Sequence, residues 1–131
     1  MKNKPSVEQL MAEAKKHESA AKCGMYLLHN GTVRESPKSK VREGADTDKK
    51  VKSLRFSYDD SILKEIISDG YKLEGIYHIK TWLNEGELEV GDDIMYVLVG
   101  GDIRPRVINA LDYIVGRIKN ECVEETEIYA L

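Results

Sequence analysis

Residues 86–119 read GELEVGDDIMYVLVGGDIRPRVINALDYIVGRIK, and this stretch decides the fold. Its first part predicts two strands, residues 87–90, which alternate between Glu and apolar residues, and residues 93–99, which are mostly apolar, separated by the turn pair Gly91-Asp92. Its second part predicts a long helix with Pro105 in the first turn, where the missing N–H would be unpaired anyway. This helix must lie on a sheet, because one face carries an apolar stripe of Val107, Ile108, Leu111, Ile114, Val115 and Ile118.

Further strands are predicted on the N-terminal side of this stretch. Residues 73–83 precede the turn Asn84-Glu85-Gly86, and residues 51–58 alternate imperfectly between apolar and polar side chains. Residues 23–33 form an apolar strand that closes at Asn30-Gly31, a turn or bulge signal. The strands between residues 73 and 99 are expected to pair as an antiparallel meander, because short turns join them.

Two helices and a loop complete the predicted order of elements. Ser6 caps a helix that runs to about residue 22, and this helix is expected to cover the sheet as a lid. Asp59 or Asp60 caps a short helix at residues 62–68. Residues 35–50 are rich in Lys and Arg and hold almost nothing apolar, so we expect a mobile loop there.

These elements predict an α+β fold, a two-layer sandwich with a mostly antiparallel sheet and the long C-terminal helix packed on it. The length of 131 residues fits one domain, residues 1–131. A net charge of −3 argues against a nucleic-acid partner, and no apolar run approaches the roughly 20 residues of a membrane span. Cys23 and Cys122 lie far apart without a CxxC pattern, which favours reduced thiols in a cytoplasmic protein.

Familiar catalytic and ligand-binding motifs are missing from the sequence. It has no GxxxxGK[ST], and no GxGxxG follows a predicted strand, so nucleotide binding is unsupported. His17, His29 and His78 stand singly, without carboxylates or cysteines at ligand spacing, so no metal is expected. Cys122 follows the end of a helix and lacks the setting of a cysteine nucleophile.

Two stretches in combination resemble a known family. Residues 24–34 read GMYLLHNGTVR, and residues 86–99 lead through Arg104 into a helix that ends in Ile118-Lys119. Both are similar to the large subunit of molybdopterin synthase, the MoaE family. Its members have a strand ending in Gly-x-Val-Arg, a Gly-Glu-Leu turn before Gly-Asp-Glu-Ile, and an arginine and a lysine at the ends of the last helix. The resemblance covers residues 24–119 and is faint between residues 35 and 73.

The resemblance implies an α/β hammerhead-type fold, a homodimer and a sulfurtransferase of molybdenum cofactor biosynthesis. A small ubiquitin-like, MoaD-like subunit would bring a thiocarboxylate into a pocket of this chain. Sulfur would pass to cyclic pyranopterin monophosphate, a pterin phosphate, to form the dithiolene of molybdopterin, and no cofactor would be consumed.

The resemblance also assigns site residues. By position, Lys119 matches the family's catalytic lysine, and Arg34 and Arg104 match arginines that bind the substrate's anionic group. A guanidinium holds a phosphate by two parallel hydrogen bonds, and a lysine beside other cations can carry protons. Because an ideal helix would separate Arg104 and Lys119 by about 22 Å, the pocket is expected to take Arg104 from the second chain of a dimer.

The chain departs from the family pattern at two positions. Family members carry a histidine before the helix-opening arginine, where this chain has Ile103. They continue into a Pro-aromatic-Trp-Lys element, where this chain reads VEET at residues 123–126, and no Lys, Arg or His follows Lys119. A less cationic pocket should bind phosphate more weakly, and the candidates to compensate are Arg106, Arg117 and Lys80.

Three functions therefore remain open at this point. The first is an active synthase subunit, which the retained arginines and lysine favour. The second is a binding module for a ubiquitin-like partner or a phosphorylated ligand, which Ile103 and Thr126 favour. The third is an enzyme that acts on another phosphorylated substrate.

Overall fold

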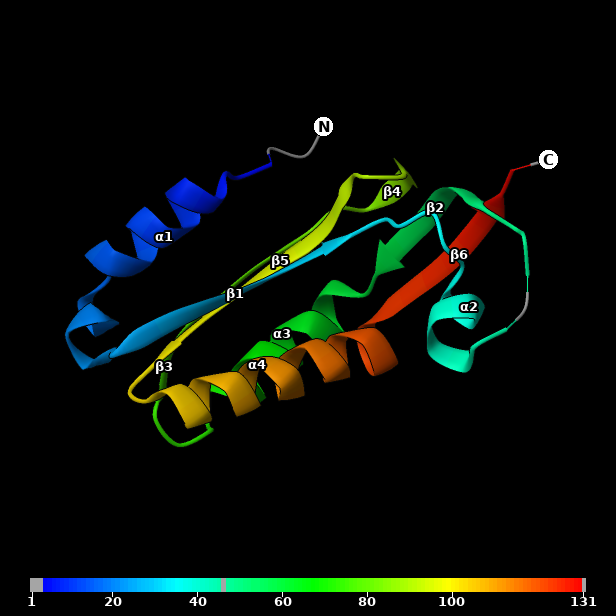
Figure 1. Ribbon diagram of the computed structural model, residues 1–131. Helices are drawn as coiled ribbons and strands as arrows, with labels where there is room; N and C mark the ends of the chain where they lie inside the picture. The colour runs from blue at the N-terminus through cyan, green and yellow to red at the C-terminus, as the bar shows by residue number, and fades with distance from the viewer. Residues whose placement is uncertain (1–3, 46, 131) are drawn as a thin grey trace.

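The computed structural model describes residues 4–45 and 47–130 (Figure 1). In chain order the elements are α1 (Val7–Lys16), η1 (Glu18–Lys22), β1 (Met25–Thr32), α2 (Lys38–Glu43), β2 (Val51–Tyr58), α3 (Asp60–Tyr71), β3 (Ile76–Leu83), β4 (Gly86–Glu89), β5 (Asp93–Gly101), α4 (Arg104–Arg117), η2 (Ile118–Cys122) and β6 (Val123–Tyr129). This order, with antiparallel sheets and a long helix near the C-terminus, confirms the predicted α+β class.

The strands form two antiparallel sheets of three strands each, in the orders β1-β5-β3 and β4-β2-β6. The predicted meander is wrong at β4, which leaves its neighbours in sequence and pairs with β2, so that Leu88 lies opposite Leu54. Gly86 and Gly91 flank this excursion with φ of 135° and 94°, a region that glycine enters without steric cost. The chain can therefore turn out of the first sheet and return as β5.

Strand β5 is the centre of the first sheet and is buried on both faces from Ile94 onward. Helix α1 covers one face, where Leu10 and Ala14 contact a cluster with Tyr96 and Leu98. Helices α3 and α4 cover the other face (Figure 1). The prediction that the N-terminal helix covers the sheet is confirmed, and the continuous apolar run of β5 follows from burial on both sides.

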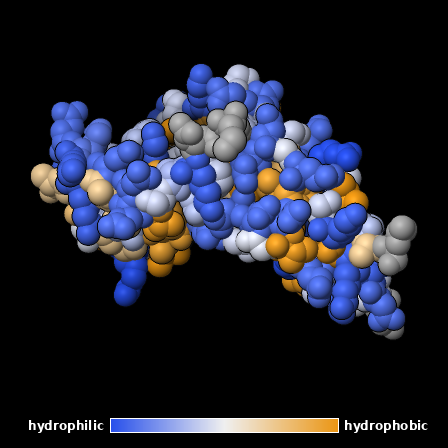
Figure 2. Space-filling view, turned by 90° about the horizontal axis from the view of Figure 1, so that it is seen from above, coloured by the Kyte–Doolittle hydropathy of each residue, from blue (hydrophilic) through white to orange (hydrophobic). Residues whose placement is uncertain are grey.

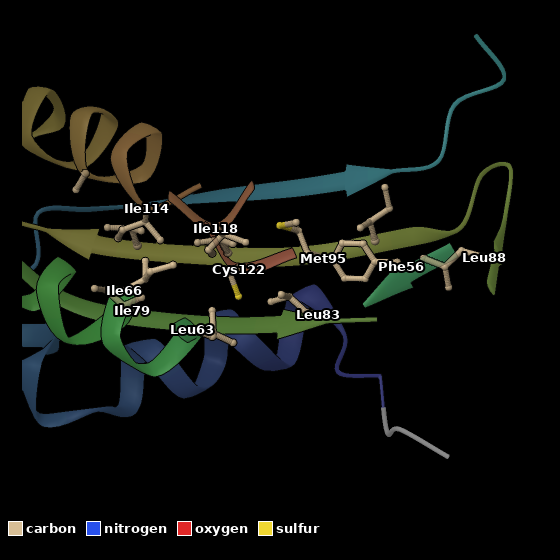
Figure 3. Packing of buried hydrophobic residues seen from close by; sticks show 14 of the residues in the cluster. Phe56, Leu63, Ile66, Ile79, Leu83, Leu88, Met95, Ile114, Ile118 and Cys122 are labelled. Carbon is tan, nitrogen blue, oxygen red and sulfur yellow. The ribbon is translucent and has the colours of Figure 1, made fainter. Parts of the chain in front are cut away.

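The main hydrophobic core joins the two sheets to α3 and α4. Figure 3 shows Ile114 and Ile118 near the helices, Met95 in the middle and Phe56 and Leu88 from the second sheet, so the apolar side chains form one continuous row. The predicted stripe on α4 is buried at Val107, Ile114 and Ile118, but Ile108 is 46% exposed. Ile108 lies about 100° around the helix from Val107, which turns it away from the sheet.

Side-chain caps define where the helices begin. Ser6 accepts a hydrogen bond from the Gln9 N–H, and the Gln9 side chain accepts one from the Ser6 N–H, which confirms the predicted capping box. The helix ends at Lys16, earlier than predicted, because His17 adopts extended backbone angles and caps η1 instead. Asp59 caps α3 by accepting hydrogen bonds from Ser61 and Ile62.

Two elements near the basic segment were not expected from the sequence. Residues 35–50 contain helix α2 rather than irregular loop throughout, and β6 adds a strand after η2. The Lys38 N–H donates to Glu127 at 2.9 Å, and β6 pairs with β2 along its length. Both elements depend on these distant partners, because neither sequence carries a strong apolar periodicity of its own.

Hydrophilic side chains cover most of the face seen in Figure 2, with apolar patches between them. The partly exposed apolar residues include Ile103, Ile108 and Tyr113 along α4. Across residues 4–45 and 47–130, no helix combines the length and the apolar character needed to cross a bilayer.

Candidate functional site

A cavity of about 640 Å³ lies between the two sheets, with walls from the end of β1, α2, β2, β5, η2 and β6. This volume is in the range of pockets that bind small molecules. Its floor includes apolar side chains such as Leu54 and Ile94. Its charged lining consists of Arg34, Lys38, Arg42, Lys119, Glu125 and Glu127.

Lys119 reaches this cavity from η2, a π-helical turn between α4 and β6. Turns of this kind occur frequently at functional sites. Its neighbours Ile118 and Cys122 are buried, and the Cys122 carbonyl accepts a hydrogen bond of 2.9 Å from the Asp59 N–H. The turn is therefore held against the start of α3, and Lys119 lies half-buried in the cavity wall.

Burial lowers the pKa of the Lys119 ammonium, because the charged form loses hydration. Glu125 acts in the opposite direction, whereas Lys38, Arg42 and Arg34 lower the pKa of Lys119 further. Lys119 thus gives up its proton more readily than a lysine in water. A lysine whose proton is held less tightly is better suited to proton transfer.

Arg34 reaches the same cavity from the end of β1. A register shift between Gly31 and Thr32 turns the end of the strand, as a β-bulge does. The buried Val33 then donates to Asp92 at 3.0 Å and accepts from Gly91 at 2.8 Å, so the backbone before Arg34 is held in place. Arg34 itself is exposed.

Arg104 and Arg106 do not line this cavity in the same chain. Arg104 is exposed at the first turn of α4, and Figure 1 shows this end of the helix far from α2 and β6. Arg106 donates to Asp102 at 2.6 Å and forms an ion pair of 3.2 Å with Glu74. A single chain therefore brings together Lys119 and Arg34 and leaves the two other predicted arginines outside.

The residues expected to compensate for a missing cation also lie outside the cavity lining. Arg117 forms ion pairs with Asp69 and Glu121, and Lys80 is exposed on β3. The additional cations come instead from Lys38 and Arg42 on α2, which the sequence did not single out. The available signal was the basic composition of residues 35–50, which gives no position for any one side chain.

His29 on β1 is a further lining residue that sequence reasoning did not assign to the site. Its Nε2 is buried and has no hydrogen-bond partner among the residues that the structure describes, and the same holds for Oε1 of Glu125. Burial and then the charge of Lys119 lower the pKa of His29, which favours the neutral imidazole. Within the part of the chain that the structure describes, no cluster of three His, Cys, Asp or Glu side chains could hold a metal ion.

In a comparison with protein families, the model described as MoaE protein matches residues 2–121. The chain belongs to the MoaE family. The match runs from before α1 through α4 and into η2, and β6 lies beyond it. No curated protein sequence matches the chain.

Solved structures of MoaE proteins share the fold of this family member. Molybdopterin synthase from Staphylococcus aureus matches with a TM-score of 0.73 and 20% identity, over 96% of this chain and 86% of that one. Molybdopterin cofactor biosynthesis protein E from Burkholderia multivorans ATCC 17616 matches with a TM-score of 0.71 and 17% identity, over 98% of this chain and 85% of that one. A complex of subunits 1 and 2 of molybdopterin-converting factor from Helicobacter pylori 26695 matches with a TM-score of 0.64 and 16% identity, over 95% of this chain and 84% of that one.

Proposed function

We propose that this chain is the large subunit of a molybdopterin synthase. It would transfer sulfur from a thiocarboxylated small subunit to cyclic pyranopterin monophosphate. Membership of the MoaE family supports a place in molybdopterin biosynthesis. The observation that carries the specific reaction is one cavity that contains both Lys119 and Arg34, the lysine half-buried with its pKa lowered.

The two side chains suit different parts of this reaction. The exposed guanidinium of Arg34 can hold a phosphate oxygen pair through parallel hydrogen bonds and so orient the substrate. Lys119 can donate a proton to the oxygen that leaves the reacting carbon while the thiocarboxylate sulfur bonds to that carbon. The product of this step is a thioester between the tail and the substrate. Water then cleaves its acyl carbon–sulfur bond, so the tail of the small subunit leaves as a carboxylate and the sulfur stays on the substrate. A second transfer completes the dithiolene.

A homodimer and a small partner subunit belong to the same proposal. The Helicobacter pylori relative is described as a complex of two different subunits, which supports a small partner for this chain as well. Arg104 lies outside the cavity of its own chain, and exposed Ile103, Ile108 and Tyr113 accompany it on α4. A second chain that buries this surface could bring Arg104 to the cavity of its neighbour.

The decisive measurement is single-turnover conversion of cyclic pyranopterin monophosphate by this chain with a thiocarboxylated small subunit. Lys119→Ala is expected to reduce the rate by about 10²–10⁴-fold, the usual contribution of a proton-transferring side chain. Lys64→Ala is the matched control, because Lys64 is a highly exposed lysine outside the cavity, on α3. Absence of product from the wild-type protein, with partner binding demonstrated, would refute the synthase assignment.

A binding module is the second candidate function. It is favoured by Ile103, which caps α4 without a side-chain hydrogen bond, and by Glu125 and Glu127, which place carboxylates in the cavity. This reading predicts tight binding of the small subunit and no turnover that depends on Lys119. The single-turnover experiment, combined with a binding titration of the small subunit, separates the two candidates.

A further inference from the structure

Helix α2 presents two basic side chains to the cavity, Lys38 and Arg42. They are four residues apart, so they lie on the same face of the helix. Lys40, between them, points elsewhere and lines a separate small pocket with Glu35 and Asp48. Of the basic residues of α2, Lys38 and Arg42 therefore face the cavity that contains Lys119, and Lys40 does not.

Strand β6 holds α2 in this orientation. The Lys38 N–H donates to Oε2 of Glu127 at 2.9 Å, and the Lys38 Nζ donates to Oε2 of Glu125 at 3.2 Å. The Glu125 side chain is only 12% exposed, and Pro37, which precedes the helix, is fully buried. Carboxylates that follow Lys119 in sequence thus anchor Lys38, which precedes Lys119 by about 80 residues.

The positive charges of α2 lie close enough to Lys119 to affect its protonation. Lys38 and Arg42, together with Arg34, lower the pKa of the Lys119 ammonium, so their charges lie within electrostatic reach of it. The cavity lining has four Lys or Arg and two Glu, which leaves a formal charge of +2. Within residues 4–45 and 47–130, neither Arg34 nor Arg42 has an ion-pair partner. Two guanidinium groups are therefore available to an anion.

We propose that Lys38 and Arg42 are anion-binding residues of this cavity, held over Lys119 by the carboxylates of β6. The residues of β6 in the cavity lining add only negative charge, and α2 adds two positive charges to those of Arg34 and Lys119. The group bound is a phosphate or carboxylate anion. Its assignment to the phosphate of the pterin substrate rests on the proposed function, whereas anion binding by α2 does not.

The first experiment measures binding of inorganic phosphate to the full-length protein by NMR titration. The double variant Lys38→Met/Arg42→Met is expected to weaken phosphate binding by about tenfold or more, because charge-assisted hydrogen bonds are lost. Lys40→Met is the matched control, since it removes one charge from the same helix but not from the cavity lining, and it should change affinity less than about twofold. Equal affinity of the double variant and the wild type would overturn the proposal.

A second pair of titrations separates the two sources of the anion. Cyclic pyranopterin monophosphate and the small subunit in its carboxylate form are titrated separately into the wild type and the double variant. Loss of pterin-phosphate binding with unchanged partner binding supports the phosphate assignment, and the opposite pattern overturns it. Phosphate binding that depends on α2 without any sulfur transfer would refute the proposed function and leave the anion site intact.

Folding of the variants is checked separately. Single Arg42→Met leaves both β6 anchors of Lys38 in place, so it should preserve α2 and still weaken phosphate binding. If Lys38→Met melts α2, the Arg42 variant alone still decides the proposal. Unchanged phosphate affinity in a folded Arg42→Met protein would overturn it.

Discussion

At the scale of single residues, Lys119 combines a positive charge with a half-buried position among other cations. Its pKa is lowered by burial and by Lys38, Arg42 and Arg34, against the opposite effect of Glu125. The folded protein therefore binds this proton less tightly than the unfolded chain does. Residues tuned for reactivity commonly reduce stability in this way.

Replacing Lys119 by Met is expected to raise the free energy of unfolding at pH 7. The unfavourable contribution is fully present below the folded-state pKa, and it disappears as pH rises toward the ordinary value of 10.5. The gain should exceed the roughly 0.5 kcal/mol typical of surface substitutions and shrink near pH 10.5. Urea denaturation at both pH values measures it, with the exposed Lys64→Met as control. A gain that does not depend on pH would contradict the electrostatic explanation.

Gly24→Ala tests a close backbone contact at the start of β1. A Cβ on Gly24 would collide with the Asp102 carbonyl oxygen, and the Gly24 N–H donates to Gly101 at 2.7 Å. The backbone must move, so a loss of about 1–3 kcal/mol is expected in the free energy of unfolding. Gly116→Ala in α4 is the control, since its Cβ meets nothing within 4 Å, and it should stabilise the helix by about 0.5–1 kcal/mol. A neutral Gly24→Ala would show that the backbone at Gly24 and Asp102 can separate without loss of stability.

At the scale of elements, the chain uses helices in two different ways. Helices α3 and α4 belong to the main core, whereas α1 is attached through a smaller cluster that includes Leu10, Ala14 and Tyr96. Helix α2 has no buried residue among its own positions and depends on β6 for its place. Elements with few buried apolar contacts open locally at lower free energy than the core.

Ser6→Ala is expected to loosen α1 without unfolding the sheet. It removes the Ser6 side-chain acceptor, which lies 3.0 Å from the Gln9 N–H, and a lost N-cap typically costs about 1 kcal/mol. Hydrogen exchange should therefore accelerate in α1, while the β5 amides keep their protection. Ser68→Ala, an exposed position on α3, is the control and should leave both rates unchanged. Faster exchange in β5 as well would mean that α1 and the sheet open together.

At the scale of the whole molecule, the candidate site is divided between the two ends of α4. Lys119 follows the C-terminal end of the helix and lies in the cavity, and Arg104 begins the helix outside it. The helix is rigid and packed along its length on the sheet, so no local movement brings Arg104 to Lys119. If Arg104 contributes to the reaction, it does so from another chain.

A mixed dimer tests this arrangement. Lys119→Ala and Arg104→Ala homodimers should both be severely impaired in sulfur transfer. A dimer with one chain of each kind has one site with both defects and one intact site, so about half of the wild-type activity should return. The activity is measured after differently tagged chains are co-purified. Failure of the mixed dimer to regain activity would place Arg104 and Lys119 in the same chain's site, whereas an active Arg104→Ala homodimer would exclude Arg104 from the site.

The sequence by itself determined the elements whose signals are local. The alternating and continuous apolar runs located β2 and β5, the capping residues Ser6 and Asp59 marked the starts of α1 and α3, and Pro105 marked the start of α4. The family resemblance pointed to Lys119 and Arg34 as members of one site, and the fold brings them to one cavity. These signals act over a few residues, through helical periodicity, turn geometry and caps, and can be recognised without tertiary contacts.

Only the tertiary structure decided the division into two sheets, the helix in residues 35–50 and the full lining of the cavity. Strand β4 pairs with β2 rather than with its neighbours in sequence, and α2 is anchored by an ion pair between Lys38 and Glu125, 87 residues apart. Segments with weak local preference adopt the structure that their long-range partners stabilise, and such partners cannot be read from composition or periodicity. The charge of the cavity depends on these contacts, because it is the packing of α2 against β6 that sets Lys38 and Arg42 beside Lys119.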